Sequence, residues 1–445
     1  MENSLTRCTY KAPHNAGSGI LRAILPKLSC VRSTMGQPES KKDLKRREII
    51  IVASRQMNEQ GATAIRLSKL SQLVGLTRNA LYYYFKDRAA LIHACYLFAC
   101  KNNAEDLHFA LSVKDGAAER LATYIDRTLR GPNAERAVLT DLDILPSAQR
   151  SELAEIINQN VGLLESILEE GISSKQLRPF NVAIGAQVIQ GLLSWAQLWY
   201  RWAALDQQAL DRHYQIAADA IKQAVLEGVS TDRTFSFSFQ QQWVDLSPRP
   251  FKAFDPESLH KEKLYQLVGA ASLLFNKKGI EATTFDDIAD QLGATKGAVY
   301  HYFKDKKALV KACFLQAFEQ YDSIADIAIN SSGNPLEQLL ASLHLNCQAQ
   351  MTRSPPLTLQ GSISNLSKSH VSRATSIAEK MSDVRASAIA AGLHSDIDEN
   401  IITLSPGAFF WISRWVEGRA IESEMALADE VCRIVFTGIR SLPEC

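Results

Sequence analysis

The chain has 445 residues, too many for one hydrophobic core, so its length predicts two to four domains. Hydrophobic residues make up 46% of it and charged residues 22%, which is typical of soluble globular proteins, and the net charge of +1 says little about partners. No apolar run reaches the roughly 18 residues that a membrane helix needs, so we expect a cytoplasmic protein without membrane contact.

The N-terminal segment, residues 1–40, shows no helical periodicity and is expected to form a disordered tail. Its apolar stretch Gly19–Val31 is interrupted by charged residues and a proline, unlike the continuous apolar segment of a signal peptide. Met35 lies just before the first helical pattern and is an alternative start to Met1.

The first helical block, residues 41–93, predicts three short helices. Ser40 and Asp43 are spaced to cap the first helix, and Gly75 supplies a tight turn before the third, residues 77–84. Two helices joined by a glycine-containing turn form the helix-turn-helix arrangement, whose second helix enters the major groove of DNA. We therefore expect a DNA-binding head.

Long apolar helical patterns follow in residues 94–230, and DNA binding alone does not require them. They predict a helical ligand-binding domain. Residues 231–258 contain three prolines and little periodicity, and we interpret them as a linker.

A second head is expected over residues 259–311, followed by a second ligand-binding domain over residues 312–445. Thr284 and Thr295 stand at the N-caps of the two short helices of this head, and Gly293 forms the turn between them. The helix at residues 296–302 is the recognition helix of this copy.

The two heads are copies of each other. Residues 61–92 and 279–310 align without a gap at an offset of 218, with twelve identical pairs in 32 positions, against about two expected by chance. Further along, the pattern Gly-x-x-x-Trp-x-x-x-Trp occurs at residues 191–199 and 407–415, at an offset of 216. The duplicated unit therefore includes more than the head.

Charge supports a nucleic-acid face on each head. Lys41–Arg88 contains eleven basic and four acidic residues, and Lys261–Lys311 contains nine and six. Both heads are basic within a nearly neutral chain, which is the charge segregation expected of a DNA-binding protein. In the first recognition helix, Arg78, Asn79 and Tyr83 suit guanine, adenine and phosphate respectively.

The strings ALYYYFKDRAALI and AVYHYFKDKKALV resemble the signature of the TetR family, T-x-x-x-I-A-x-x-x-G-x-x-x-x-x-x-Y-x-x-F-x-x-K-x-x-L. The second copy matches it closely. The first departs, with Arg66 in place of the threonine, Ser71 in place of the alanine and Arg88 in place of the lysine. The resemblance implies an all-α fold of two tandem units, each a three-helix head plus a helical ligand-binding domain. Family members are usually homodimeric repressors that release DNA when a small molecule binds.

Residue by residue, the resemblance and the chemistry of the helices give the candidate DNA contacts. These are Arg66, Thr77, Arg78, Asn79, Tyr82, Tyr83 and Arg88 in the first head, and Thr284, Thr295, Lys296, Gly297, Tyr300, His301 and Lys306 in the second. We expect the two units to pack as an intramolecular pseudo-dimer that reads an imperfect palindrome in operator DNA. A homodimer of tandem chains with four heads is the alternative assembly.

Trp195, Trp199, Trp411 and Trp415 are candidates to line an effector pocket, although aromatic stripes more often form core or interface. Relatives of similar pattern sense acyl-CoA thioesters, so an acyl-CoA or an aromatic compound is the expected effector. No catalytic, nucleotide-binding or metal-ligand motif is present, so we expect a regulator without enzyme activity, cofactor or metal. The alternative function is a small-molecule-binding or scaffold protein with weakened DNA binding.

Overall fold

The computed structural model describes residues 40–131, 134–203, 207–234, 254–358, 368–394, 404–415 and 423–442. The expected tail, except Ser40, and most of the expected linker lie outside these ranges. Within these ranges the chain is helical, and the only β-type pairings are two isolated bridges, Leu177 with Arg440 and Ser230 with Leu393. None of the described helices is long and apolar enough to cross a membrane.

The first half runs through one head and a body of long helices. Its elements are α2 (Lys41–Gln60), η1 (Ala62–Ala64), α3 (Leu67–Leu73), α4 (Arg78–Tyr84), α5 (Arg88–Leu111), α6 (Ala117–Arg130), η2 (Leu142–Ile144), α7 (Ser147–Ser173), α8 (Val182–Ala203), α9 (Gln207–Lys222) and η3 (Gln223–Glu227).

The second half repeats this order with a more interrupted body. Its elements are α10 (Pro256–Lys278), α11 (Phe285–Leu292), α12 (Lys296–Tyr302), α13 (Lys306–Ile329), α14 (Pro335–Met351), α15 (Lys368–Lys380), α16 (Ser382–Ala390), η5 (Ser405–Ala408), α18 (Ile412–Trp415) and α19 (Glu424–Thr437). Here α15 and α16 stand where the first half has the continuous α7.

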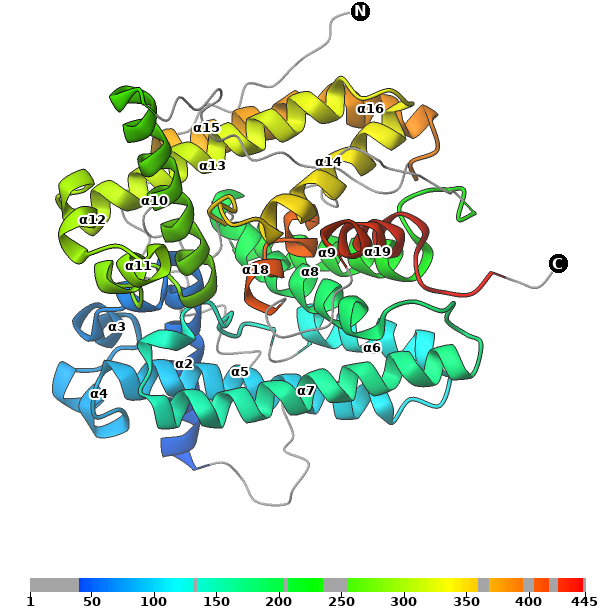
Figure 1. Ribbon diagram of the computed structural model, residues 1–445. Coiled ribbons are helices and arrows are strands. Elements are labelled where there is room, and N and C mark those ends of the chain that lie inside the picture. The colour runs from blue at the N-terminus through cyan, green and yellow to red at the C-terminus, as the bar shows by residue number, and fades with distance from the viewer. Residues whose placement is uncertain are drawn as a thin grey trace, which may run out of the picture.

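The halves are stacked, with both heads at the same end of the molecule (Figure 1). The first half forms the lower layer and the second half the upper layer, and α8, α9, α18 and α19 lie between them. One hydrophobic core runs through both halves, from Leu121 and Leu164 in the first to Leu340 and Val431 in the second. The expected all-α fold with two tandem units is confirmed.

The bonds between the halves come in reciprocal sets. Val229 and Ser230 donate their backbone N–H groups to the carbonyls of Val435 and Phe436, and Ile439 and Arg440 donate to Val225 and Leu226, all at 2.9–3.0 Å. Each half therefore places the segment after its last helix against the other half's last helix. Reciprocal exchange of this kind is the pattern of a two-fold contact.

The interface helices approach closely at two glycines. A Cβ atom on Gly191 of α8 would collide with the carbonyl oxygen of Gly407, and one on Gly407 would lie 2.8 Å from the carbonyl oxygen of Gly191. Trp195, one turn along α8, is 1% exposed and packs edge-on against Phe410 with ring centroids 5.1 Å apart. The repeated glycines thus serve the contact between the two halves.

Candidate DNA-binding surface and effector cavity

The second head forms the helix-turn-helix that its sequence predicts. Thr284 and Asp287 make a reciprocal capping box at the start of α11, and hydrogen bonding from Thr284 lowers the pKa of Asp287 to about 2. Gly293 takes a left-handed conformation, φ 62°, in the turn, and the Thr295 hydroxyl caps α12 by accepting the N–H of Ala298 at 3.3 Å.

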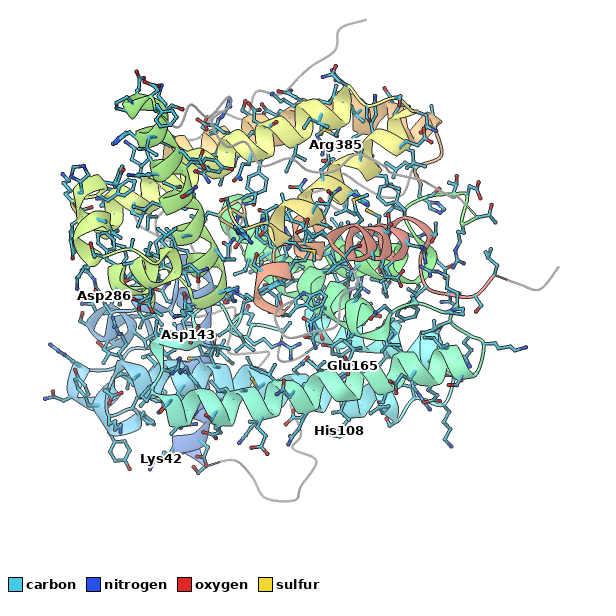
Figure 2. All side chains as sticks on the ribbon, in the orientation of Figure 1. Lys42, His108, Asp143, Glu165, Asp286 and Arg385 are labelled. Atoms are coloured by element: carbon cyan, nitrogen blue, oxygen red, sulfur yellow. The ribbon has the colours of Figure 1, made fainter. Side chains whose placement is uncertain are left out.

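The side chains expected to read DNA stand on the outside of α12. The exposed positions of this helix include Lys296, Gly297, Tyr300 and His301. Lys296 is held by an ion pair to Asp286, 2.7 Å away, and Tyr300 packs edge-on against Phe285 while half of its surface stays exposed. Figure 2 shows Asp286 at the edge of the second head and Lys42 on the first.

The first head presents its α4 in the same way. Thr77 caps the helix by accepting the N–H of Ala80, and the exposed residues include Arg66, Arg78, Asn79, Tyr82 and Tyr83. The Arg78 guanidinium lies 5.7 Å from the centre of the Tyr82 ring, and Lys42 stands 4.8 Å from that of Tyr83. This surface is therefore cationic and aromatic, which suits phosphate and base contacts.

Two of the expected phosphate ligands also bind the protein's own backbone. Arg88 donates to the carbonyl of Thr63 at 2.9 Å, and its counterpart Lys306 donates to the carbonyls of Ile280 and Glu281 at 3.0 and 3.1 Å. Each fixes the loop that leads into the helix-turn-helix. The replacement of lysine by arginine in the first copy therefore preserves this bond.

An asparagine anchors each head to its helical body. Asn58 donates to the carbonyl of Arg136 and accepts the N–H of Val138, both at 2.8 Å. Its counterpart Asn276 makes the same two bonds with the segment 356–358, at 2.9 and 2.8 Å. Both side chains are at least 95% buried. The two asparagines are 218 positions apart, the same offset as the aligned blocks, and lie just before the start of those blocks. Extending the alignment by three residues towards the N-terminus would have identified them.

The body of the first half contains a cavity of about 170 Å³ between α5, α6, α7 and α8. Asn103, Tyr124 and Ser194 are among the polar side chains that line it, and Gln187, Gln190 and Gln197 place side-chain amides along its α8 wall. The Tyr124 hydroxyl donates to Asn103 Oδ1 at 2.9 Å, and burial raises the Tyr124 pKa to about 12, so the phenol is neutral at physiological pH.

The cavity reaches the segment that anchors the first head. Arg136 and Val138 line it, and these are the residues that bond to Asn58. The Arg136 guanidinium is already paired with the buried carboxylate of Asp106 at 3.0 Å. A molecule in the cavity would therefore contact the segment that anchors the first head. It would not meet a free positive charge on Arg136, because that guanidinium is already paired with Asp106.

The second half fills the equivalent space with aromatic rings. Cys100, Asn103 and Ser194 line the first-half cavity, and the repeat places Phe318, Tyr321 and Phe410 at their positions. Phe318 and Phe410 are 4% and 3% exposed, and the Tyr321 ring centre lies 6.4 Å from that of Phe410. The sequence signal for this difference, which our expectations did not include, is that small side chains in the first copy correspond to aromatic side chains in the second.

The four tryptophans that were expected to line a pocket lie in different environments. Trp411 lines the first-half cavity from the other half of the chain, and its indole N–H donates to the Gly191 carbonyl at 3.4 Å. Trp195 is buried in the core and does not line this cavity. Trp415 packs at the edge of the same core, and the Trp199 side chain lies outside the described residues. In the described parts of the chain no group of three or more His, Cys, Asp or Glu is placed to hold a metal.

The profile of bacterial regulatory proteins of the tetR family matches twice, at residues 49–95 and 267–313. Two tetR-family units stand in tandem in this chain. The profile of the tetracyclin repressor-like C-terminal domain matches residues 114–215, in the first half, which contains the cavity.

Similar proteins match mainly over one head. The transposon Tn10 TetC protein of Escherichia coli is 41% identical over 63 residues, which are 14% of this chain and 32% of that protein. The fatty acid metabolism regulator protein of Bacillus subtilis is 25% identical over 151 residues, 33% of this chain and 78% of that protein. The chain thus spans about a third of the first of these. The crystal structure of the TetR-family regulator PfmR from Thermus thermophilus aligns with a TM-score of 0.32 at 21% identity, covering 39% of this chain and 97% of that one.

Proposed function

We propose that this chain is a ligand-responsive transcription repressor in which the two heads of one polypeptide replace the two subunits of a homodimer. The observation that carries this proposal is that two basic heads, each with an exposed recognition helix, lie at one end of a single body joined by reciprocal bonds. The matching family consists of regulatory proteins, which supports regulation of bacterial DNA at the nucleoid rather than catalysis.

The operator of such a protein is an imperfect palindrome. At three exposed positions the recognition helices differ: Arg78, Asn79 and Tyr83 in the first head correspond to Lys296, Gly297 and His301 in the second. Arginine and asparagine bind base edges with two hydrogen bonds, whereas a lysine contributes one charge and a glycine no side chain. The half-sites therefore differ in sequence and lie about one DNA turn apart, or slightly more.

The effector binds in the first-half cavity. An apolar cavity of about 150 Å³ accommodates benzene, so 170 Å³ suits a molecule with one ring. The neutral amides, the hydroxyls and the paired Arg136 favour an uncharged aromatic with hydroxyl or amide groups over a thioester carrying the phosphates of coenzyme A. The molecule releases DNA only if it binds the non-binding conformation more tightly, and a hundredfold effect needs about 2.7 kcal/mol.

DNA binding is tested with the chain's own promoter and with duplexes selected from a random library. We expect a complex of one chain per duplex, measured by light scattering, and a double-logarithmic salt slope steeper than about −3. Two chains per duplex would favour the four-head homodimer. Absence of specific binding would favour the small-molecule-binding or scaffold function.

The contribution of each head is tested with paired variants. Arg78→Ala with Tyr82→Ala, and separately Lys296→Ala with Tyr300→Ala, should each weaken operator binding at least about tenfold, as expected when one or more base or phosphate contacts are lost. An unchanged affinity in the first variant would make the first head only a structural partner.

Effector binding is tested by calorimetry with neutral phenols and benzamides and with acyl-CoA thioesters, alongside gel shifts. Ser194→Phe, which introduces the ring found at the second-half position 410, should abolish ligand binding and leave basal DNA affinity unchanged. If acyl-CoA alone alters DNA affinity, the uncharged-ligand proposal is wrong. If no bound ligand alters it, the protein is a constitutive DNA binder.

A further inference from the structure

One arginine joins parts of the molecule that belong to different halves. Arg414 on α18 donates from Nε to the carbonyl of Asn276 at 2.8 Å, from Nη1 to that of Leu139 at 3.3 Å, and from Nη2 to that of Thr140 at 2.8 Å. Its guanidinium is also 5.1 Å from the centre of the Trp411 ring. Burial lowers the pKa of Arg414, and nearby carboxylates, Asp141 first, oppose that shift.

The three carbonyls lie next to the two head anchors. Asn276 is the residue that ties the second head to its body through its side chain, so Arg414 binds the backbone of that anchor. Leu139 and Thr140 follow directly on the segment that Asn58 binds in the first head. A short chain of hydrogen bonds therefore runs from the first head, through Arg414, to the second.

The neighbouring aspartate completes this junction between the heads. Asp141 is 5% exposed, and burial raises its pKa, opposed by the charge of Arg414, the Thr140 hydroxyl and the backbone N–H of Ala62 in the first head. A Cβ atom on Gly279, at the end of the second head's α10, would lie 3.1 Å from Asp141 Oδ1. The aspartate thus contacts the first head and lies close against the second. Asp143, two residues on, is seen in Figure 2 below the second head.

The junction occurs once, because the repeat does not duplicate the arginine. At an offset of 216 the first-half counterpart of Arg414 is Leu198, which is 1% exposed in the shared core. A leucine side chain has no donor for a carbonyl. Arginine presents a rigid planar fork with donors in divergent directions, and lysine presents all its donors at one point. Only the arginine side chain suits three carbonyls that come from two segments.

We propose that Arg414 is the positioning residue that fixes the separation and orientation of the two recognition helices, and thereby the half-site spacing that the protein accepts. This inference rests on the proposed function, in which both heads bind one operator. Each base pair inserted between half-sites moves the second site by about 3.4 Å and turns it by about 34°. A rigid connection between the heads rejects such a change, whereas a loose one tolerates it.

The test uses the full chain and a duplex selected from a random library by the wild-type protein. Affinity is measured for the selected duplex, for duplexes with one or two base pairs inserted or removed between half-sites, and for each half-site alone. The variants are Arg414→Leu, which installs the first-half residue, and Arg414→Lys, which keeps the charge. Arg373→Leu is the matched control, since that exposed arginine pairs with Asp322 on the surface of the same half.

The wild type and the control should lose about tenfold or more in affinity at each altered spacing, the scale of a lost specific contact. Arg414→Leu should bind all spacings within about threefold of one another, with affinity for single half-sites unchanged, because only the tethered second contact is affected. Arg414→Lys should lie between them, and it decides the question if the leucine variant does not fold. A wild-type spacing profile in either folded variant overturns the proposal.

Failure of the underlying function has a different signature. If the wild type selects single half-sites or binds every spacing equally, its heads do not act together, and both the proposed function and the role of Arg414 are wrong. If the wild type is strict and the arginine variants are equally strict, the proposed function stands and only the role of Arg414 fails.

Discussion

The two halves share a chain order and an anchor for the head, but they differ in the centre of the helical body. The first half leaves a cavity of about 170 Å³ beside the segment that holds its head, and continuous helices α7 and α8 wall it. The second half has rings at the equivalent positions and shorter helical segments around them. The first half, which matches the tetracyclin repressor-like C-terminal domain, therefore keeps an open cavity, whereas the equivalent part of the second half is filled by packed rings. Both halves have a head.

The largest expected effect is on stability, and it comes from creating a cavity in the packed body of the second half. Phe410→Ser removes a ring that is 3% exposed and packs on Trp195 and Phe409. We expect a loss of about 3–5 kcal/mol in the free energy of unfolding, since deleting a buried aromatic ring leaves a cavity. Chemical denaturation measures it. The control is Ser194→Ala at the equivalent first-half position, which should cost far less. Equal costs would mean that the second half is not packed by this ring.

The head anchors test what the halves have in common. Asn58→Ala leaves a buried carbonyl and a buried N–H without a partner, so it should cost about 2–4 kcal/mol of stability. Asn276→Ala leaves the buried N–H of Thr358 without a partner, whereas the Pro356 carbonyl keeps its bond from Gln350 Nε2, so it should cost about 1–3 kcal/mol. Asn79→Ala, at an exposed asparagine of the first recognition helix, should change stability little. A large cost in one half and none in the other would show that the anchors are not equivalent.

The heads themselves should respond unequally to loss of one cation. The Lys296 ammonium must leave Asp286 before it binds phosphate, whereas Arg78 rests on the ring of Tyr82. We expect Arg78→Ala to weaken operator binding about tenfold and Lys296→Ala only a few-fold, with Asp286→Asn strengthening it. Gel shifts at fixed salt measure this. Lys114→Ala, an exposed lysine beyond the far end of α5, is the control. A larger loss for Lys296 than for Arg78 contradicts the expectation.

The heads were predictable because their signals are local. Caps such as Thr284 and Thr295 and the turn at Gly293 depend on residues a few positions apart, and the sequence pattern contains all of them. The cavity and the junction at Arg414 depend on segments hundreds of residues apart, and no local pattern reports which side chains meet there. The Trp195 and Trp411 pair illustrates this limit: the same repeat position is core in one half and cavity wall in the other.

The smallest effect concerns one buried histidine in each half. His213 is 6% exposed and bonds to the Ala196 carbonyl at 3.0 Å, and His344 is fully buried against Asp429 and Gln348. Burial lowers the pKa of both below the ordinary 6.5, only partly opposed in His344 by Asp429. The unfolded chain therefore takes up these protons at a higher pH than the folded chain does. Stability should be constant above about pH 7 and should fall as the pH drops below 6.5.

The fall should amount to about 1 kcal/mol per histidine for each pH unit in that window, because one unit of pKa difference corresponds to about 1.4 kcal/mol. Thermal unfolding between pH 5 and pH 8 measures it. His213→Gln removes the proton uptake while keeping a donor for the Ala196 carbonyl, so it should flatten the profile by about half, and His344→Gln should do the same for the second half. His108→Gln, at an exposed position on α5, should leave the profile unchanged. If both buried variants keep the wild-type slope, these histidines take up protons as readily in the folded chain as in the unfolded chain, and the acid sensitivity comes from other groups.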